Sequence, residues 1–258
     1  MSLMEVNQIS FSYPHQGNIF TNVNFTVRAG DILTFLGPNG VGKSTLLKCL
    51  LGFNKVNAGT ICLNHRQLDQ LSPRAIARQV AYVPQNYQIS TGLSVTDYLL
   101  TARNPYLKPL QVPGNSEHRL VQKYLADFDL TTLADQRFSS LSGGQQQIVT
   151  IIKALIQTPS LLILDEPMAA LDLKRQREVM TILKKLAHQG MAIVLTTHLP
   201  DHVFLLDSKV GLFFPNGELK VGTSSSLMTT ENLEKIYQTP LELTYLPTLH
   251  RYTCQLKV

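Results

Sequence analysis

The stretch Gly37-Pro38-Asn39-Gly40-Val41-Gly42-Lys43-Ser44 decides the fold of this chain. It fits the pattern G-x-x-x-x-G-K-[ST], in which glycines let the backbone curl so that successive N–H groups point inward at phosphate oxygens. An apolar run over residues 31–36 precedes it, and a helical pattern over residues 43–51 follows it. A strand, a glycine loop and a helix in this order place the positive end of the helix dipole on an anion, so the sequence predicts a nucleotide phosphate site.

The end of this loop supplies the side chains for that chemistry. Lys43 is expected to reach the β- and γ-phosphates, and the hydroxyl of Ser44 is expected to hold Mg²⁺. Thr45, the next residue, is also expected at the nucleotide. The alternative is a chance glycine turn, which the flanking strand and helix argue against.

A second site follows the apolar run at residues 161–164, which ends in Asp165 and Glu166. Ligands of open α/β sheets bind where the strands end, so both carboxylates are expected at the nucleotide. Asp165 is placed to hold Mg²⁺, directly or through water. Glu166 is placed to polarise an attacking water, and a general base of this kind gives about 10²–10⁴ in rate. The alternative is that the pair only ends a strand.

Strands and helices alternate around these two sites. Residues 1–30 show a period of two with a turn at residues 14–18, which predicts paired strands. Alternating strands and helices predict a parallel sheet with both faces covered. Further strands are expected at residues 80–83 and 191–195, a hairpin at 209–214 and 217–221, and helices at 172–190 and 231–237.

The middle of the chain has a helical pattern instead. Helices are expected over residues 94–103, 117–128 and 143–157, with a loop over residues 104–115. We therefore expect one domain over residues 1–258. A catalytic core with a β subdomain takes residues 1–85 and 158–258, and a helical subdomain takes residues 86–157.

The segment Leu141-Ser142-Gly143-Gly144-Gln145 resembles the signature of ATP-binding-cassette (ABC) ATPases. A serine and glycines at a helix N-terminus are again suited to an anion. In this family two domains pair head to tail, and the signature of one closes on the ATP held by the other. The resemblance implies an α/β fold: a P-loop NTPase (RecA-like) core with an N-terminal antiparallel β subdomain and an inserted α-helical subdomain. It also implies contacts from Ser142, Gly143, Gly144 and Gln145 to that ATP.

Four more positions match the family pattern. Tyr13 is similar to the aromatic that stacks on adenine, an interaction of about 1–3 kcal/mol, although a core aromatic is the alternative. Gln85 resembles the glutamine that senses Mg²⁺ and the γ-phosphate. Asp172 resembles the acidic residue of the loop that crosses the dimer interface, and it also suits a helix cap. His198 resembles the switch histidine, which orients Glu166 and water.

The chain departs from the family pattern at four places. Gln146 and Gln147 stand where an arginine usually follows the signature glutamine, and Met168 and Ala169 stand where Thr and Ser are common. None of these side chains is a chemical group of the mechanism. The departures concern local packing at the interface and the rate of hydrolysis.

Three stretches resemble one branch of the family, the ATPases of iron-siderophore, haem, vitamin B12 and molybdate importers. They are residues 101–107, residues 171–176 and residues 228–237, the last of which resembles a C-terminal Leu-Thr-x-Glu-x-Leu…Tyr pattern. The resemblance therefore implies an ATP-hydrolysing importer subunit, with ATP and Mg²⁺ as its nucleotide and metal. An importer ATPase for another solute is the alternative.

Composition sets the remaining expectations. The 258 residues are 44% hydrophobic and carry a net charge of +5, which excludes global disorder. No apolar run reaches the roughly 18 residues that cross a bilayer, and three cysteines without metal-ligand spacing fit a reducing compartment. We expect a peripheral protein on the cytoplasmic face of the bacterial inner membrane. Its expected partners are a second copy, two integral membrane permease subunits and a substrate-binding protein.

A soluble ABC ATPase that acts on nucleic acid or ribosomes is a further alternative, because the chain is basic. Such proteins carry two cassettes or long coiled-coil or zinc insertions, and the sequence has neither. We therefore expect no nucleic-acid partner, and the positive charge fits ATP and an anionic membrane surface.

Overall fold

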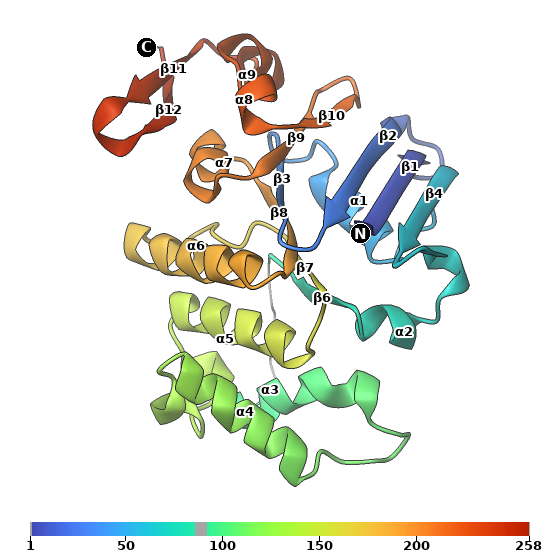
Figure 1. The fold of residues 1–258 in the computed structure, drawn as a ribbon, viewed down its shortest axis with the longest axis vertical. Coiled ribbons are helices and arrows are strands. Elements are labelled where there is room, and N and C mark those ends of the chain that lie inside the picture. Colours follow the sequence, from blue (N-terminus) through green and yellow to red (C-terminus); the bar gives the residue numbers. More distant parts are fainter. Residues whose placement is uncertain (1, 86–91, 258) are drawn as a thin grey trace.

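The computed structural model describes residues 2–85 and 92–257. The expected subdomain boundary at residue 86 and the chain ends 1 and 258 lie outside the described residues. Figure 1 shows the helical middle of the chain at one end of the molecule and the C-terminal elements at the other, with a sheet between them. The predicted phosphate-binding and catalytic residues follow the carboxyl ends of strands in this sheet.

The central sheet has six strands in the order β10-β9-β3-β8-β7-β6. Neighbouring strands from β9 through β3, β8 and β7 to β6 are parallel, and β10 pairs antiparallel to β9. This confirms the predicted parallel sheet and the predicted hairpin. The strands are β3 (Ile32–Leu36), β6 (Val80–Val83), β7 (Leu161–Leu164), β8 (Ala192–Thr197), β9 (Lys209–Phe213) and β10 (Leu219–Gly222).

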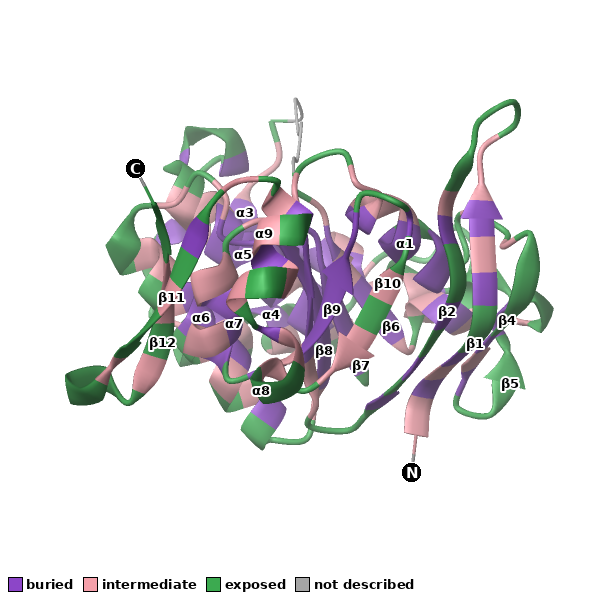
Figure 2. Cartoon of the chain, turned by 90° about the horizontal axis from the view of Figure 1, so that it is seen from above, coloured by how far each residue is buried: buried purple, intermediate pink, exposed green. Residues whose placement is uncertain are grey.

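Continuous apolar runs make these strands because both faces of the sheet are covered. All four residues of β7 and all six of β8 are buried. In Figure 2 the strands β8 and β9 are coloured as buried in the middle of the molecule. Helix α6 (Leu173–His188) packs on one face through Val179 and Leu183, and Asp172 is its N-cap as predicted.

A second sheet is antiparallel and has the order β2-β1-β4-β5. Its strands are β1 (Ser2–Ser12), β2 (Asn18–Arg28), β4 (Ala58–Leu63) and β5 (Arg66–Gln67). Buried residues alternate along β2, as the period of two predicts. Helix α1 (Lys43–Leu50) lies in one core cluster with both sheets, so the phosphate loop has packed structure on both sides. Short helices η1 (Leu68–Gln70) and α2 (Pro73–Ala77) complete this part.

The helical part has a buried cluster of its own, whose members lie between Val95 and Ile156. The helices predicted at 117–128 and 143–157 are confirmed as α4 (Asn115–Asp127) and α5 (Gly143–Ile156). The first predicted helix differs, because α3 (Val95–Leu100) continues as the 3₁₀ helix η2 (Thr101–Tyr106), which contains Pro105. The predicted loop therefore begins later than expected. Two 3₁₀ turns, η3 (Thr131–Leu133) and η4 (Phe138–Ser140), lead to α5.

The C-terminal part contains elements that the sequence patterns did not indicate. Helix α9 (Thr230–Tyr237) confirms the predicted helix, but a further hairpin of β11 (Leu241–Leu246) and β12 (Arg251–Leu256) follows it. The hairpin was missed because most of its side chains are only partly buried or exposed. Over residues 2–85 and 92–257, every helix is too short or too polar to span a lipid bilayer. The remaining elements are α7 (Pro200–Leu206), α8 (Ser224–Leu227) and η5 (Pro247–Leu249).

Candidate active site

The site forms where four neighbouring strands of the central sheet end. Strands β3, β8, β7 and β6 lie side by side, and carboxyl ends of parallel strands meet at one edge of a sheet. The phosphate loop follows β3 and Gln85 closely follows β6. Asp165 and Glu166 follow β7, and His198 follows β8. The topology therefore brings together residues that are up to 161 positions apart, as Gly37 and His198 are.

The phosphate loop requires glycine at two of its positions. Gly40 and Gly42 have φ angles of +81° and +116°, in the region that residues with a Cβ rarely adopt. A Cβ on Gly42 would also lie 2.4 Å from Cγ2 of Ile19. Gly42 is the N-cap of α1, so the turn ends where the helix dipole begins. Between buried Gly37 and this cap, the loop residues Pro38, Asn39, Gly40 and Val41 are half-buried or exposed.

Lys43 is the first residue of α1, its side chain folds back onto the loop, and it is only 5% exposed. Its Nζ donates to the carbonyl oxygens of Gly37, at 2.8 Å, and Pro38, at 3.0 Å. It also lies 3.2 Å from Oε1 of Glu166. Burial lowers the pKa of the Lys43 ammonium, and the nearby Glu166 and Asp165 carboxylates oppose that shift. The phosphate-loop cation and the two predicted carboxylates are therefore neighbours.

Glu166 contacts three nitrogen-bearing side chains, those of Lys43, Gln85 and His198. Besides Lys43, its Oε2 lies 3.0 Å from Nδ1 of His198 and accepts a bond of 3.4 Å from Nε2 of Gln85. Its backbone has a φ of +46°, which is uncommon for a residue with a side chain and typical of functional sites. The carboxylate is therefore oriented from three directions.

Thr196, the fifth residue of β8, was missed by the sequence analysis. Its fully buried hydroxyl donates to Oδ1 of Asp165 at 2.6 Å and accepts from the backbone N–H of Glu166 at 2.8 Å. One side chain therefore fixes both carboxylate-bearing residues. A threonine in an apolar strand gave no signal, because β-branched residues are ordinary in strands.

Oxygen atoms suited to Mg²⁺ come from three elements of the site. Ser44 is the second residue of α1, Asp165 directly follows β7 and is 4% exposed, and Gln85 follows β6. Hydroxyl, carboxylate and amide oxygens are the hard ligands that Mg²⁺ takes, together with phosphate oxygens. The residues present therefore fit the expected metal.

Tyr13 lies directly after β1 and approaches the phosphate-loop helix. Its hydroxyl is 3.4 Å from Oγ1 of Thr45 and 3.5 Å from Nδ2 of Asn54. Its ring meets Phe11 edge to face, with the ring centres 5.0 Å apart, and the residue is half-buried. The structure thus places Tyr13 and Thr45 together at the start of α1, and stacking on adenine stays a prediction.

The signature residues begin helix α5, in the helical part. The Ser142 hydroxyl accepts from the N–H of Gln145, and Oε1 of Gln145 accepts from the N–H of Ser142, which makes a capping box. Gly143 has open space where a Cβ would be, whereas a Cβ on Gly144 would lie 2.9 Å from Cγ of Arg175. The signature therefore lies against the start of α6 and presents a helix N-terminus suited to an anion.

Asp172 lies on that same helix start. Its Oδ1 accepts from the N–H of Arg175 at 2.8 Å, which confirms the predicted cap. The preceding loop contains Ala170 at a φ of +59°, and Nε2 of Gln176 donates to the carbonyl oxygens of Leu171 and Met168. The loop is thus fixed from within the chain, and its contact with a second copy stays a prediction.

Two of the four departures from the family pattern, Gln146 and Met168, have structural reasons. Nε2 of Gln146 donates to the carbonyl oxygens of Phe138 and Leu141, both at 3.2 Å, so it holds the turn before the signature. Gln147 is buried in α5. Met168 is 1% exposed and belongs to the core cluster around β7, where an apolar side chain fits. Nothing in the structure explains Ala169.

Two further residues behind His198 were also missed. Oγ1 of Thr197 lies 2.8 Å from Nδ1 of His202 and accepts from the N–H of Leu199 at 3.2 Å. His202 is buried, and burial together with the neighbouring His198 lowers the pKa of its imidazole to about 4. A neutral His202 therefore helps to fix the turn that carries His198.

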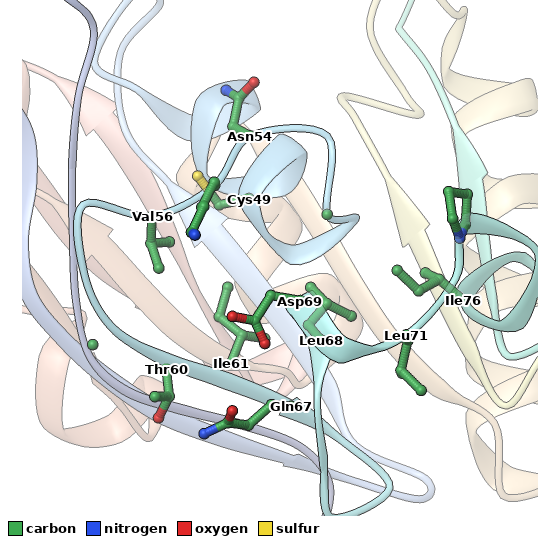
Figure 3. A pocket seen from close by; sticks show the side chains of 14 residues that line it. Cys49, Asn54, Val56, Thr60, Ile61, Gln67, Leu68, Asp69, Leu71 and Ile76 are labelled. Carbon is green, nitrogen blue, oxygen red and sulfur yellow. The ribbon is translucent and has the colours of Figure 1, made fainter.

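A separate cavity of about 240 Å³ lies between the end of α1, β4 and α2. Figure 3 shows that its walls carry Val56, Ile61, Leu68 and Ile76, with Asp69 and Gln67 on one side. Among the described residues, no predicted site residue lines it. The cavity is therefore distinct from the candidate active site.

Comparisons with known proteins agree with this geometry. The family model described as ABC transporter matches residues 20–169. The chain is 34% identical to the molybdate import ATP-binding protein MolC of Haemophilus influenzae over 239 residues, 92% of this chain and 89% of that one. It is 32% identical to the hemin import ATP-binding protein HmuV of Shewanella denitrificans over 242 residues, 91% of this chain and 93% of that one.

A solved structure agrees as well. The fold matches a metal-chelate type ABC transporter in an inward-facing conformation, with a TM-score of 0.88 and 31% identity. The match covers 100% of this chain and 98% of that one. With the phosphate loop, the paired carboxylates and the signature in place, the chain belongs to the ATP-binding subunits of ABC transporters.

Proposed function

We propose that this chain is the ATP-hydrolysing subunit of a bacterial ABC importer that takes up a metal chelate. The observation that carries the proposal is the position of Glu166. It lies between Lys43, at 3.2 Å, and His198, at 3.0 Å, at the edge of the sheet where the phosphate loop follows β3. This arrangement puts a general base beside the residues that bind phosphate.

Each group of the site has a separate role in ATP binding and hydrolysis. Backbone N–H groups of the loop and the ammonium of Lys43 bind the β- and γ-phosphates and balance their charge. Glu166 accepts a proton from the attacking water, and His198 donates from Nδ1 to that carboxylate and so orients it. Tyr13 stacks on the adenine ring.

Ser44, Asp165 and Gln85 are the residues that would hold Mg²⁺. When bound, the ion neutralises charge that develops on the phosphate oxygens. Thr196 keeps Asp165 in place for this role, because its hydroxyl donates to Oδ1 at 2.6 Å. Gln85 contacts Glu166 as well, so it connects the metal site to the general base.

The signature needs a second copy of the chain. Ser142, Gly143, Gly144 and Gln145 begin a helix of the helical part, whereas the phosphate loop leads into α1, which shares a core cluster with both sheets. A head-to-tail dimer places each signature on the ATP of the partner and puts Asp172 at the interface. ATP binding closes this dimer, and hydrolysis opens it.

A complete importer contains further partners of this chain. Two integral membrane permease subunits and a substrate-binding protein complete the complex, and the chain sits on the cytoplasmic face of the inner membrane. In this proposal residues 86–157 form the helical subdomain, and residues 1–85 and 158–258 form the catalytic core. Relatives that import molybdate and hemin, together with a metal-chelate type transporter, support a metal chelate over another solute.

The decisive experiment replaces Glu166 by Gln, which keeps the shape and removes the base. ATP turnover is expected to fall by about 10²–10⁴, while ATP still binds and ATP-dependent dimers accumulate. Glu218→Gln, at an exposed ion pair with Lys220, is the matched control and keeps normal turnover. Normal ATP hydrolysis by Glu166→Gln would contradict the proposed role of Glu166 as general base.

A further inference from the structure

A hydrogen bond joins the C-terminal part of the chain to the backbone of the proposed switch residue. Tyr237, the last residue of α9, donates from its hydroxyl to the carbonyl oxygen of His198 at 2.8 Å. Burial raises the pKa of the Tyr237 phenol above its ordinary value, so the hydroxyl keeps its proton and acts as a donor. The bond therefore fixes the carbonyl group of His198, the residue that carries the imidazole.

Helix α9 is a rigid platform for this donor. Its buried residues Leu233 and Ile236 belong to one cluster with Leu36, the residue immediately before the phosphate loop. Thr229 caps the helix, and Oε1 of Glu234 accepts from the N–H of Leu241. The hydroxyl of Tyr237 is thus fixed relative to the strand that leads into the nucleotide site.

The turn after β8 has a second attachment to the same C-terminal part. The N–H of Cys254 in β12 donates to Oδ1 of Asp201 in the first turn of α7, at 3.1 Å. The residues between β8 and α7 are therefore held from outside the central sheet at both ends. Of the two attachments, the one from Tyr237 acts on His198 itself.

The position of His198 matters because its Nδ1 lies 3.0 Å from Oε2 of Glu166. A small displacement of the backbone would move the imidazole away from that carboxylate, and misplacements of this size slow enzymes. We propose that Tyr237 is a positioning residue, whose bond to the His198 carbonyl fixes the imidazole against Glu166. This inference rests on the proposed ATPase function, and it gives a role to the C-terminal Tyr of residues 228–237.

The test is Tyr237→Phe in the full chain, which removes only the hydroxyl. Loss of one hydrogen bond is expected to lower kcat for ATP by roughly three- to tenfold. The KM for ATP is expected to stay the same, because the Tyr237 hydroxyl bonds to a main-chain oxygen and not to a side chain that binds phosphate. Tyr106→Phe is the matched control, since the Tyr106 hydroxyl also donates to a main-chain oxygen, that of Gln157 at 2.9 Å, in the helical part. Tyr106→Phe is expected to keep the kcat of the parent chain.

A double-mutant cycle separates positioning from a general loss of structure. Phosphate release is measured for the parent, Tyr237→Phe, His198→Ala and the double variant. If Tyr237 acts through His198, its substitution has no further effect once His198 is Ala. An unchanged kcat for Tyr237→Phe, or the same fall in both backgrounds, overturns the inference while the ATPase proposal stands. A parent chain that does not hydrolyse ATP overturns both.

Discussion

The Nζ atom of Lys43 lies 3.2 Å from Oε1 of Glu166, and both side chains are less than a tenth exposed. The phosphate-loop cation and the proposed general base therefore form a buried ion pair. Two charges in a buried place are tolerated because each compensates the other, so loss of one partner leaves the other uncompensated. Binding of a phosphate here requires Lys43 to share its charge between the phosphate and Glu166.

Lys43→Met tests this relationship. Removal of the ammonium eliminates a charge-assisted bond to phosphate, so the Kd for ATP is expected to rise about 10- to 100-fold. The variant is also expected to lose about 3 kcal/mol of unfolding free energy, because Glu166 then lacks its cation. Titration with a fluorescent ATP analogue and urea unfolding measure the two effects.

Two comparisons make the Lys43 result specific. Lys48→Met, on an exposed position of the same helix, is expected to leave both quantities unchanged. Lys43→Met combined with Glu166→Gln is expected to regain part of the lost stability, since no charge remains uncompensated. Equal stability of the single and double variants would argue against a coupled pair.

Thr196→Val removes a hydroxyl and keeps the shape of the side chain. The N–H of Glu166 then loses its buried acceptor, and Asp165 loses its donor. A buried donor without a partner costs about 1–3 kcal/mol, so the unfolding free energy is expected to fall by that amount. Because Asp165 also becomes less fixed, ATP turnover is expected to need more Mg²⁺, which a Mg²⁺ titration of the rate measures.

The control for this prediction is Thr34→Val in the neighbouring strand β3. Thr34 is equally buried, and its hydroxyl bonds to Ser208 at 2.7 Å, outside the residues expected to hold Mg²⁺. It is expected to lose stability without any change in the Mg²⁺ requirement. A Mg²⁺ requirement of Thr196→Val equal to that of the parent chain would contradict the role given to Thr196.

Strands β3, β7 and β8 could be predicted because each is a mainly apolar run that is followed by glycine, a carboxylate or histidine. The hairpin β11–β12 could not, since residues such as Tyr245 and Tyr252 are nearly half exposed and leave no clear alternation. The extension of α3 into a 3₁₀ helix through Pro105 was also unpredicted, because proline ordinarily indicates the end of a helix.

Some residues of the candidate site could likewise be predicted from the sequence, and others could not. Lys43, Asp165 and Glu166 could be predicted because glycine spacing and a strand end mark them in one sequence, and His198 could be predicted from its resemblance to the switch histidine of the family. Thr196, His202 and Tyr237 could not, because each acts through a backbone or side-chain bond to a residue elsewhere in the fold. A partner of this kind becomes visible only when the sheet brings its strands together.

Gln146 gives a prediction about the departure from the family arginine. Its amide donates to two carbonyl oxygens, those of Phe138 and Leu141, so the position requires a donor. Gln146→Arg is expected to be tolerated, because guanidinium also donates. Gln146→Glu is expected to lose about 1–3 kcal/mol of unfolding free energy, since a carboxylate faces oxygens that it cannot bond. Urea unfolding measures both variants.

Substitution of Gln146 is also expected to affect ATP-dependent dimerisation. The turn at residues 138–141 leads into the signature, so Gln146→Glu is expected to weaken ATP-dependent dimerisation, measured by analytical ultracentrifugation in the Glu166→Gln background. Gln136→Glu is the surface control, because the exposed Gln136 amide also donates to a carbonyl oxygen, that of Thr132. If Gln146→Glu and Gln136→Glu behave alike, Gln146 does not hold the turn.

His202 makes the stability of the chain depend on pH. Burial first, and the neighbouring His198 second, lower the pKa of its imidazole from 6.5 to about 4. Between these two values the unfolded chain binds a proton at this residue and the folded chain does not. The unfolding free energy therefore falls as the pH is lowered from 6.5 towards 4. Above pH 6.5, the pKa in the unfolded chain, the contribution of His202 is fully present.

His202→Asn is expected to remove this contribution, because the amide cannot titrate and its oxygen can still accept from Thr197. From pH 7.5 to pH 5, the His202 proton costs the parent chain about 2 kcal/mol of unfolding free energy that the variant does not lose. Urea unfolding at the two pH values measures the difference, and groups common to both chains cancel. His188→Asn, at an exposed position near the end of α6, controls for loss of a histidine and is expected to follow the parent. If His202→Asn loses as much stability at pH 5 as the parent, His202 is not the buried neutral imidazole that the structure places behind His198.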